Sequence, residues 1–316
     1  MNTYNKPKKA KMALLHPHLE YKPVEFTKII YEKEGNIAKI TLNDPDHRNV
    51  TDWPGQEGIT DQFHYALHDA EFDDDIKVVV IKGAGKDFQA GHDLNEVGYI
   101  YGMGTGKDDK RRASQRIRYS VDKGFFHDTQ QKILLHPKIT ICQCHGNCLG
   151  SGVYYPLLSD LAVAATDAKF ATVEQRLGFA GSGSQVALLM MNIGIKRALG
   201  MLLTGAKISG EEAARIGLVN KAVPPDQLDD EVQKLAESMA LLPRDGIAIG
   251  KATRRLIYEG WGLTNGLVYI SHAMFTNLRW EPDEYNFFKE RRDKGTKDGF
   301  KARDKRYKGK AERLDK

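Results

Sequence analysis

Long hydrophobic runs are what this sequence most clearly lacks. No window approaches the roughly 18–20 uninterrupted apolar residues that a membrane-spanning helix needs, and the basic N-terminus is followed only by the short apolar stretch Met12–Leu15. Neither a membrane helix nor the apolar core of a secretion signal is therefore predicted. We expect a cytoplasmic protein with no membrane partner.

Cysteine is also scarce, which excludes a disulfide framework. The chain has three cysteines, Cys142, Cys144 and Cys148, and such an odd, clustered set suits a reducing compartment. With His145 they could suggest a metal site. However, Ile139–Cys144 has the pattern of a buried strand, where cysteine packs as a small hydrophobe, and no second ligand pair appears elsewhere. We therefore expect buried thiols and no metal.

The charge of the chain is unevenly distributed. The 316 residues are 41% hydrophobic and 28% charged, which is enough for a substantial core, and the net charge is +5. Residues 289–316 hold 13 Lys and Arg against 6 Asp and Glu, and residues 1–12 hold four Lys. The two basic ends are either solvated tails or attract a phosphorylated ligand or nucleic acid. We favour solvated tails, so nucleic acid is not the expected partner.

The strand patterns predict an α/β fold with a parallel sheet. Apolar runs bounded by turn residues occur at Asn36–Leu42, Val78–Ile81, Lys138–Cys144, Leu161–Ala165 and Leu218–Val223. Helical patterns separate most of them, which is typical of parallel pairing. Residues 1–25 show no apolar period and are predicted to be an extension. Residues 26–195 form the predicted α/β core, and residues 196–316 a mainly helical region with a basic tail.

Two helices in the second half are indicated by their own residues. Ser209–Glu212 has the form of a capping box, and Gly217 is a plausible end for the short helix that it opens. After Val223, apolar residues recur at spacings of three and four over residues 228–242, which predicts an amphipathic helix.

Glycine-rich segments mark the candidate ligand-binding loops. Gly83–Leu94 and Gly146–Gly152 each follow a buried strand, so each can direct backbone N–H groups at a ligand. The turn before Val153 leads into an apolar helix, where unpaired N–H groups would favour an anion or oxyanion; the glycines there could equally serve only close packing. A third segment, residues 102–106, follows no buried strand, which argues against a dinucleotide loop.

Several of these segments together resemble the crotonase (enoyl-CoA hydratase/isomerase) family in order and spacing. They are Ile40–Asn49, Val78–Leu94, Pro137–Asp160, Ala168–Phe170, Leu203–Gly205 and Gly217–Asn220. The resemblance spans about residues 26–306. It implies a spiral of ββα units, a helical C-terminal region that builds homotrimers, often paired into hexamers, and a coenzyme A thioester as substrate. No other cofactor is implied.

The resemblance also assigns roles to particular residues. The backbone N–H groups of His92 and Ser151 would form an oxyanion hole for the thioester oxygen, and Glu174 would be the acid/base. Arg48 and Ala90 match positions that bind coenzyme A. Tyr154 stands where hydratases of the family carry a first glutamate.

The tyrosine leaves the reaction open. A phenol donates hydrogen bonds at neutral pH but is a poor base, so Tyr154 either orients a substrate oxygen or is a wall of the pocket. Addition or elimination of water, as in a lyase, is the preferred reaction. Isomerisation of an enoyl-CoA and C–C bond hydrolysis of a cyclic β-keto acyl-CoA are the alternatives. A non-catalytic protein that binds RNA or another protein is the alternative of another class.

Four further parts of the chain are predicted to support the site. Val50–Thr60 and Gly98–Lys123 are expected to shape the acyl pocket, the second as a lid. Asp93 and Asp160 are expected to fix loops.

Overall fold

The computed structural model describes residues 25–55, 57–101, 113–178, 184–264 and 282–309. Of the predicted N-terminal extension, residues 1–25, all but Glu25 lie outside the described residues. No helix in the described ranges combines the length and hydrophobicity needed to cross a membrane.

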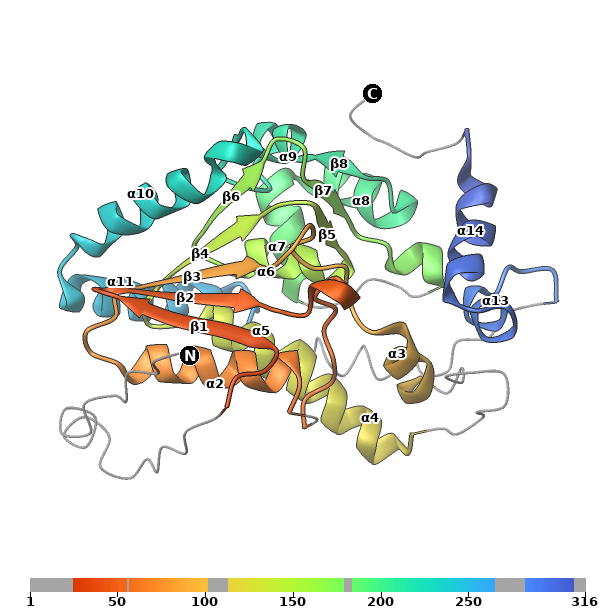
Figure 1. Ribbon diagram of the computed structural model, residues 1–316, viewed down its shortest axis with the longest axis horizontal. Helices are drawn as coiled ribbons and strands as arrows, with labels where there is room; N and C mark the ends of the chain where they lie inside the picture. Colours follow the sequence, from red (N-terminus) through yellow and green to blue (C-terminus); the bar gives the residue numbers. More distant parts are fainter. Residues whose placement is uncertain (1–24, 56, 102–112, 179–183, 265–281, 310–316) are drawn as a thin grey trace.

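A six-stranded sheet, ordered β1-β2-β3-β4-β6-β9, forms the centre of the molecule (Figure 1). Its strands are β1 (Ile29–Glu34), β2 (Ile37–Leu42), β3 (Val78–Gly83), β4 (Ile139–Cys144), β6 (Leu161–Ala165) and β9 (Lys221–Val223). All neighbouring strands are parallel except β1 and β2. The predicted parallel α/β core is therefore confirmed. β1 was not predicted, because this edge strand is mostly half-exposed and ends in three consecutive charged residues, Glu32–Glu34.

A second sheet of three short strands, ordered β5-β7-β8, lies beside the first. Its strands are β5 (Asn147–Leu149), β7 (Lys169–Ala171) and β8 (Ile208–Ser209). β5 leads into the 3-10 helix η3 (Gly150–Val153), and β7 is followed by the 3-10 helix η4 (Glu174–Leu177). Because β5 and β7 are parallel, both helices begin at the same edge of this small sheet.

Helices cover the sheets on several sides. α2 (Ile59–Phe72) packs against β1 and β2, α6 (Tyr154–Leu158) against β4 and β6, and α10 (Leu228–Ala240) along β2, β3, β4 and β6. The other helices are α3 (Leu94–Ile100), α4 (Gln115–Asp122), α5 (Gln130–Leu134), α7 (Ser184–Ile193), α8 (Ile195–Thr204), α9 (Gly210–Ile216), α11 (Arg244–Gly260), α13 (Phe287–Lys294) and α14 (Thr296–Tyr307). The remaining short helices are η1 (Pro45–His47), η2 (Lys123–Thr129) and η5 (Pro225–Gln227).

The helix signals read from the sequence are confirmed. Ser209 caps α9 by accepting a hydrogen bond from the Glu212 amide at 3.1 Å, and Gly217 ends the helix in the left-handed conformation with φ of 87°. α10 follows at the predicted amphipathic segment. β9 lies beyond residue 195 yet pairs with β6, so the sheet extends past the boundary drawn between core and helical region.

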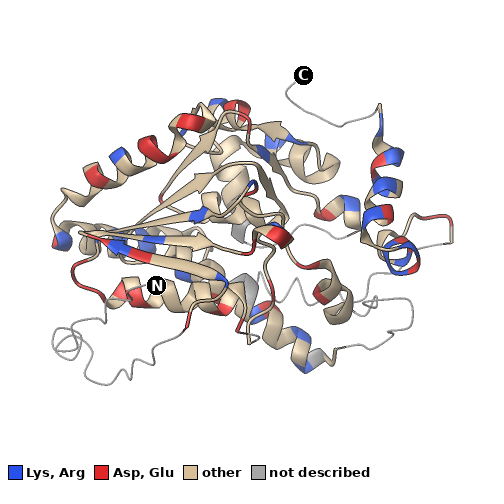
Figure 2. Cartoon of the chain, in the orientation of Figure 1, with Lys and Arg blue, Asp and Glu red and all other residues tan. Residues whose placement is uncertain are grey.

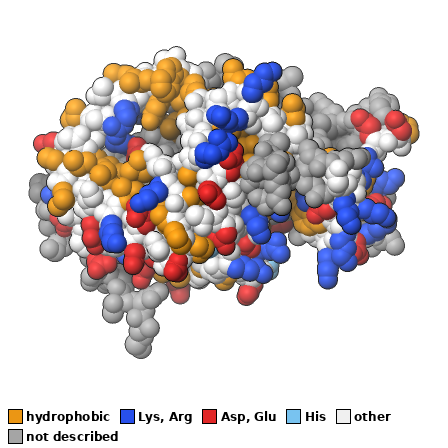
Figure 3. All heavy atoms as spheres, turned by 90° about the horizontal axis from the view of Figure 1, so that it is seen from above, with side chains coloured by type: hydrophobic (Ala, Val, Ile, Leu, Met, Phe, Trp, Pro, Cys, Tyr) orange, Lys and Arg blue, Asp and Glu red, His pale blue; other side chains and the backbone are white. Residues whose placement is uncertain are grey.

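The C-terminal helices form a basic lobe at one end of the molecule. Lysine and arginine gather on α13 and α14 at the right of Figures 2 and 3. The lobe is attached to the rest of the chain, since Phe287 and Phe288 are buried and the Arg291 guanidinium donates to the Asn95 side chain of α3 at 2.7 Å. This part of the basic tail is therefore folded.

Candidate active site

The two predicted glycine-rich loops lie side by side beyond the carboxyl ends of β3 and β4. The Phe88 amide donates to the His145 carbonyl and the Leu149 amide to the Gln89 carbonyl, each at 3.0 Å. The contact requires glycine, because a Cβ at Gly152 would overlap the Gln89 carbonyl oxygen. The parallel sheet thus brings together two loops that are about 60 residues apart, as the Asn147 to Asp87 hydrogen bond between them also shows.

A third segment holds the loop that carries His92. The Thr51 amide donates to the Gly91 carbonyl at 2.9 Å, and the Asp93 amide donates to the Thr51 carbonyl at 3.0 Å. Thr51 and His92 therefore form an isolated parallel bridge. Asp93 also caps α3 by accepting from the Asn95 amide at 2.7 Å, as expected for a residue that fixes the loop.

The Ser151 amide lies at the start of a helix and close to the His92 loop. Ser151 is the second residue of η3, and the first amide groups of a helix have no acceptor within it. Gly150 takes the left-handed conformation, with φ of 56°. A Cβ built at Gly150 would lie 3.7 Å from the Gly91 Cα, so the segments of the two predicted oxyanion donors meet here.

Glu174 and Tyr154 adjoin the same turn. Glu174 is the first residue of η4, and its Oε1 accepts a hydrogen bond from the Tyr154 hydroxyl at 2.7 Å. The same Oε1 would lie 3.6 Å from a Cβ at Gly150. The predicted acid, the tyrosine and both candidate donor segments therefore converge on one place.

The candidate site around Glu174 does not lie in the larger of the two cavities described here. Glu174 and Tyr154 border a small apolar cavity of about 10 Å³, whose other lining residues are Val153, Leu157, Thr172, Val186, Leu189 and Leu202. A much larger groove of about 1060 Å³ runs between α6 and α11 and shares only Leu157 with the small cavity. The convergence of backbone donors with a carboxylate, and not volume, identifies the candidate site.

Aromatic residues that the sequence did not single out stand beside the His92 loop. The Trp53 indole stacks on the His92 ring with centroids 4.9 Å apart, and the Tyr101 ring meets Trp53 edge-on at 6.3 Å. The buried Tyr101 hydroxyl donates to Asp122 Oδ1 at 2.9 Å. Burial first, then Asp122, raises the pKa of Tyr101 well above its usual value.

Only the segments of these aromatic residues could be predicted. Trp53 falls in Val50–Thr60, and Tyr101 and Asp122 fall in Gly98–Lys123, of which residues 102–112 lie outside the described residues. No local pattern distinguishes a pocket aromatic from a core aromatic, because both are apolar residues on an inward face.

The two predicted coenzyme A contacts are adjacent. The Ala90 amide donates to the Arg48 carbonyl at 3.1 Å, so the turn after β2 is tied to the loop after β3. The Arg48 side chain is 56% exposed, and its Nε lies 3.8 Å from Asp87 Oδ2. An exposed guanidinium at the rim of the loop can meet an anionic group arriving from solvent.

The cysteines are packed as expected from the strand pattern. Cys142, Cys144 and Cys148 are fully buried free thiols, and the Cys142 and Cys144 Sγ atoms lie 3.6 Å apart on one face of β4. Within the part of the chain that the structure describes, no group of three or more His, Cys, Asp or Glu side chains is arranged to hold a metal ion.

Solved structures share this architecture. The crystal structure of an enoyl-CoA hydratase/isomerase from Xanthobacter autotrophicus Py2 superposes with a TM-score of 0.74 at 28% identity, over 89% of this chain and 99% of that one. The fold is therefore the crotonase fold.

Two relatives in sequence carry different names. The mitochondrial enoyl-CoA hydratase domain-containing protein 3 of Rattus norvegicus is 32% identical over 251 residues, which is 78% of this chain and 76% of the relative. The 1,2-epoxyphenylacetyl-CoA isomerase of Escherichia coli is 29% identical over 227 residues, 71% of this chain and 80% of the relative.

Residues 32–256 match the model of the enoyl-CoA hydratase/isomerase family, and the chain belongs to that family. Membership of the family assigns the chain to enzymes that process acyl-CoA.

Proposed function

We propose that this protein adds water to an enoyl-CoA, or eliminates it from a hydroxyacyl-CoA, and that the N–H groups of His92 and Ser151 stabilise the thioester enolate. The hydrogen bond between Tyr154 and Glu174, at the point where the two donor segments meet, carries the proposal. A carboxylate beside the two donor segments would be within reach of a proton on the carbon next to the thioester. Arg48 and Ala90 would meet the coenzyme A part of the substrate.

Each group has one task in the elimination direction. The Glu174 carboxylate takes a proton from Cα, and the electron pair of the broken C–H bond moves onto the thioester oxygen. The two N–H groups stabilise that oxygen, each by about 3–4 kcal/mol on the usual scale of an oxyanion-hole donor. The electrons then form the Cα–Cβ double bond as hydroxide leaves Cβ, and the proton on Glu174 converts the hydroxide to water. Hydration is the reverse sequence.

Tyr154 would orient the carboxylate or donate to an oxygen of the substrate, since its hydroxyl has only one proton to donate. Donated to Glu174, that proton holds the carboxylate in one rotamer; turned towards the substrate, it can meet a leaving or entering oxygen. The phenol cannot replace a second carboxylate as base. This supports a site with one base.

Isomerisation is the second candidate. Moving a double bond needs one base that removes a proton at one carbon and returns it at another, which a site built on Glu174 alone can perform. The Escherichia coli relative named as an isomerase makes this candidate specific. The two reactions differ in mass, because only hydration adds water to the substrate.

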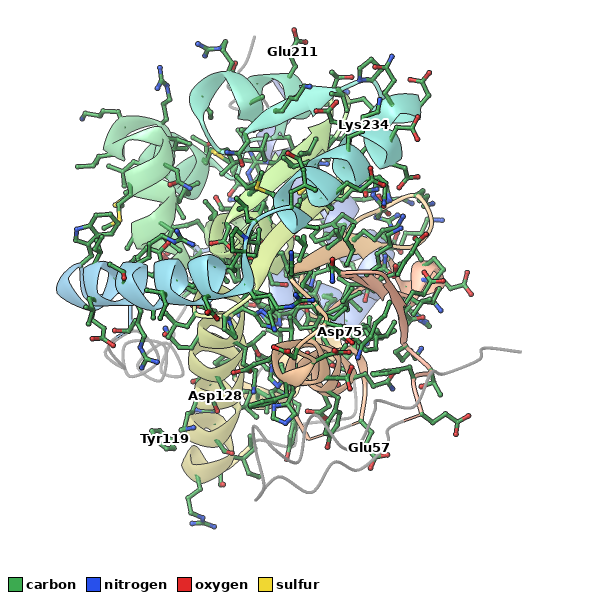
Figure 4. All side chains as sticks on the ribbon, turned by 90° about the vertical axis from the view of Figure 1, so that its left-hand side faces the viewer. Glu57, Asp75, Tyr119, Asp128, Glu211 and Lys234 are labelled. Carbon is green, nitrogen blue, oxygen red and sulfur yellow. The ribbon has the colours of Figure 1, made fainter. Side chains whose placement is uncertain are left out.

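The decisive experiment incubates the purified protein with straight-chain, aromatic and cyclic acyl-CoAs and identifies the products by mass spectrometry and NMR. Glu174→Gln should lower the rate of the chemical step by about 10²–10⁴-fold, since it removes the acid/base. Glu211→Gln is the matched control, because Glu211 is exposed on α9 and projects from the outside of the molecule in Figure 4. Near-normal activity of Glu174→Gln on the true substrate would refute the mechanism.

Tyr154→Phe then separates the reactions. A large loss in kcat with little change in KM would indicate that the phenol acts in the transition state, as in addition or elimination of water. A near-neutral effect would favour the one-base isomerase, with Tyr154 as wall. Products with a cleaved carbon chain or opened ring would instead identify a C–C hydrolase.

A binding assay tests the class of function itself. If no acyl-CoA raises the melting temperature while RNA binds with strong salt dependence, the protein is a binding module and the enzyme proposal is wrong.

A further inference from the structure

We propose that the side chains of Thr51, Gln89 and Ser151 form a positioning triangle that sets the spacing of the two backbone N–H donors. The inference rests on the proposed function, since it concerns how the His92 and Ser151 amides are held. Three segments contribute one side chain each, so the triangle joins parts of the chain that only the folded structure brings together.

The three side chains form a closed ring of hydrogen bonds. The Gln89 amide nitrogen donates to the Thr51 hydroxyl, and the Ser151 hydroxyl donates to the Gln89 Oε1 at 3.0 Å. The Thr51 and Ser151 hydroxyl oxygens are 3.1 Å apart. Because the Ser151 proton is directed at Gln89, Thr51 must donate across this last edge. Each member then donates once and accepts once.

Because the ring is buried, each of its polar groups depends on the other two for its hydrogen bonds. Gln89 is fully buried, and Thr51 and Ser151 are each 1% exposed. Water therefore does not replace a missing partner, and loss of one hydroxyl leaves the other two groups short of a donor or an acceptor. The ring is therefore satisfied in one geometry, which is what a positioning device requires.

Thr51 and Ser151 are each coupled directly to a candidate donor, and Gln89 links the two loops. The Thr51 backbone holds the residues on both sides of His92: its amide donates to the Gly91 carbonyl, and its carbonyl accepts from the Asp93 amide. Ser151 carries the second N–H on the same residue as its ring hydroxyl. Gln89 joins the two, because its carbonyl accepts from the Leu149 amide.

The two glycine-rich loops are in close backbone contact. A Cβ at Gly152 would overlap the Gln89 carbonyl, and one at Gly91 would lie 3.2 Å from the Leu149 carbonyl oxygen. A change in one side chain of the ring therefore moves both loops relative to each other instead of being absorbed locally.

The test compares Thr51→Val, which keeps the shape and removes the hydroxyl, with Thr51→Ser, which keeps the hydroxyl. Displacement of a donor by a fraction of an ångström should lower kcat by about 10-fold in Thr51→Val with KM nearly unchanged, because the donors act mainly on the enolate. Thr51→Ser should restore most of the rate. Thr41→Val is the control, since Thr41 is a buried threonine on β2, 7% exposed and outside the ring.

A spectroscopic measurement separates positioning from general stability. A bound 3-oxoacyl-CoA forms an enolate that absorbs in the near ultraviolet, and the fraction of enolate reports on the oxyanion donors. Thr51→Val should reduce this band while a saturated acyl-CoA of the same length binds as tightly as to the wild type. Ser151→Ala, which retains the N–H, should reduce the band in the same way and serves if Thr51→Val does not fold.

The outcomes distinguish the two proposals. If Thr51→Val matches Thr41→Val in kcat and in the enolate band, or if Thr51→Ser is as defective as Thr51→Val, the positioning triangle is wrong even though Glu174→Gln is inactive. If the wild type neither turns over any acyl-CoA nor forms the enolate band, the proposed function itself fails.

Discussion

His136 shows how burial fixes the protonation state of a single residue. Its Nε2 lies 3.1 Å from the Leu67 carbonyl oxygen and its Nδ1 accepts from the Lys138 amide at 3.2 Å, so the ring bridges α2 and the start of β4 as a neutral imidazole. Burial lowers the pKa of His136 to about 4. Burial, with a contribution from Lys132, also lowers the pKa of His64 to about 4.

We therefore expect the protein to lose stability in mild acid. Because both folded-state pKa values lie below the unfolded value near 6.5, the unfolded state takes up protons first as the pH falls. The free energy of unfolding should decrease from about pH 6.5 towards pH 4, by up to about 1.4 kcal/mol per pH unit for each histidine. Denaturant titrations at several pH values measure this slope. His136→Gln should reduce the slope by about half, and an unchanged slope would contradict the assignment.

At the proposed catalytic residues, the resemblance implies that Tyr154 stands where hydratases of the family carry a glutamate. A glutamate in place of Tyr154 would give two carboxylates at one turn, whereas the tyrosine gives one carboxylate and one neutral donor that bind each other at 2.7 Å. The sequence predicts which residue is altered. The hydrogen bond that joins Tyr154 to Glu174 comes from the parallel pairing of β5 and β7.

At the scale of elements, an ion pair between buried Lys251 and partly buried Asp160 attaches α11 to the sheet. Lys251 Nζ contacts both oxygens of Asp160 at 2.6 and 2.7 Å, and the Thr140 amide and hydroxyl also donate to Asp160. Burial lowers the pKa of Lys251, while Asp160 opposes that effect. The sequence predicted that Asp160 fixes a loop; the structure shows that it also anchors a helix 91 residues away along the chain.

Lys251→Met should destabilise the protein by about 2 kcal/mol, because it leaves the largely buried Asp160 carboxylate without its cation. Asp160→Asn combined with Lys251→Met should be less destabilised than the two single variants added together, since the double variant leaves no unpaired charge. Lys234→Met is the control, as this lysine is exposed on α10 (Figure 4). Equal loss in the two lysine variants, measured by denaturant unfolding, would show that the pair contributes nothing specific.

At the scale of the whole molecule, one large apolar groove exposes hydrophobic side chains to solvent. The groove of about 1060 Å³ is bordered by Met191, Leu242 and Trp261, which are 50%, 43% and 57% exposed. Leu256 and Ile257 of α11 are exposed as well. The resemblance attributes self-association to the helical C-terminal region; within that region Leu263 is buried inside the chain, and residues 265–281 lie outside the described residues.

We still expect a homotrimer or hexamer, because exposed apolar surface of this kind marks protein interfaces. Light scattering at micromolar concentration should give a multiple of the mass of one chain. Leu256→Glu should shift the mass towards that of a monomer by placing a charge in the interface. Tyr119→Glu, on α4 and away from the groove (Figure 4), should not. A monomeric wild type would contradict the prediction.

Local patterns in the sequence determined the fold class, most strands of the main sheet and the glycine loops. Alternating or continuous apolar residues and turn residues act over a few positions, so their consequences can be read without tertiary structure. They also identified Glu174, Tyr154, His92 and Ser151 as candidates, through the resemblance of the segments that contain them.

Only the tertiary structure decided how those candidates meet. Thr51 and Ser151 are 100 residues apart in the chain, and Tyr154 and Glu174 are 20 apart, yet each pair is within hydrogen-bond distance. The ring of Thr51, Gln89 and Ser151 has no sequence signal, because its members are common polar residues whose partners are chosen by the register of the sheets and not by spacing along the chain. Burial then turns those contacts into constraints on geometry.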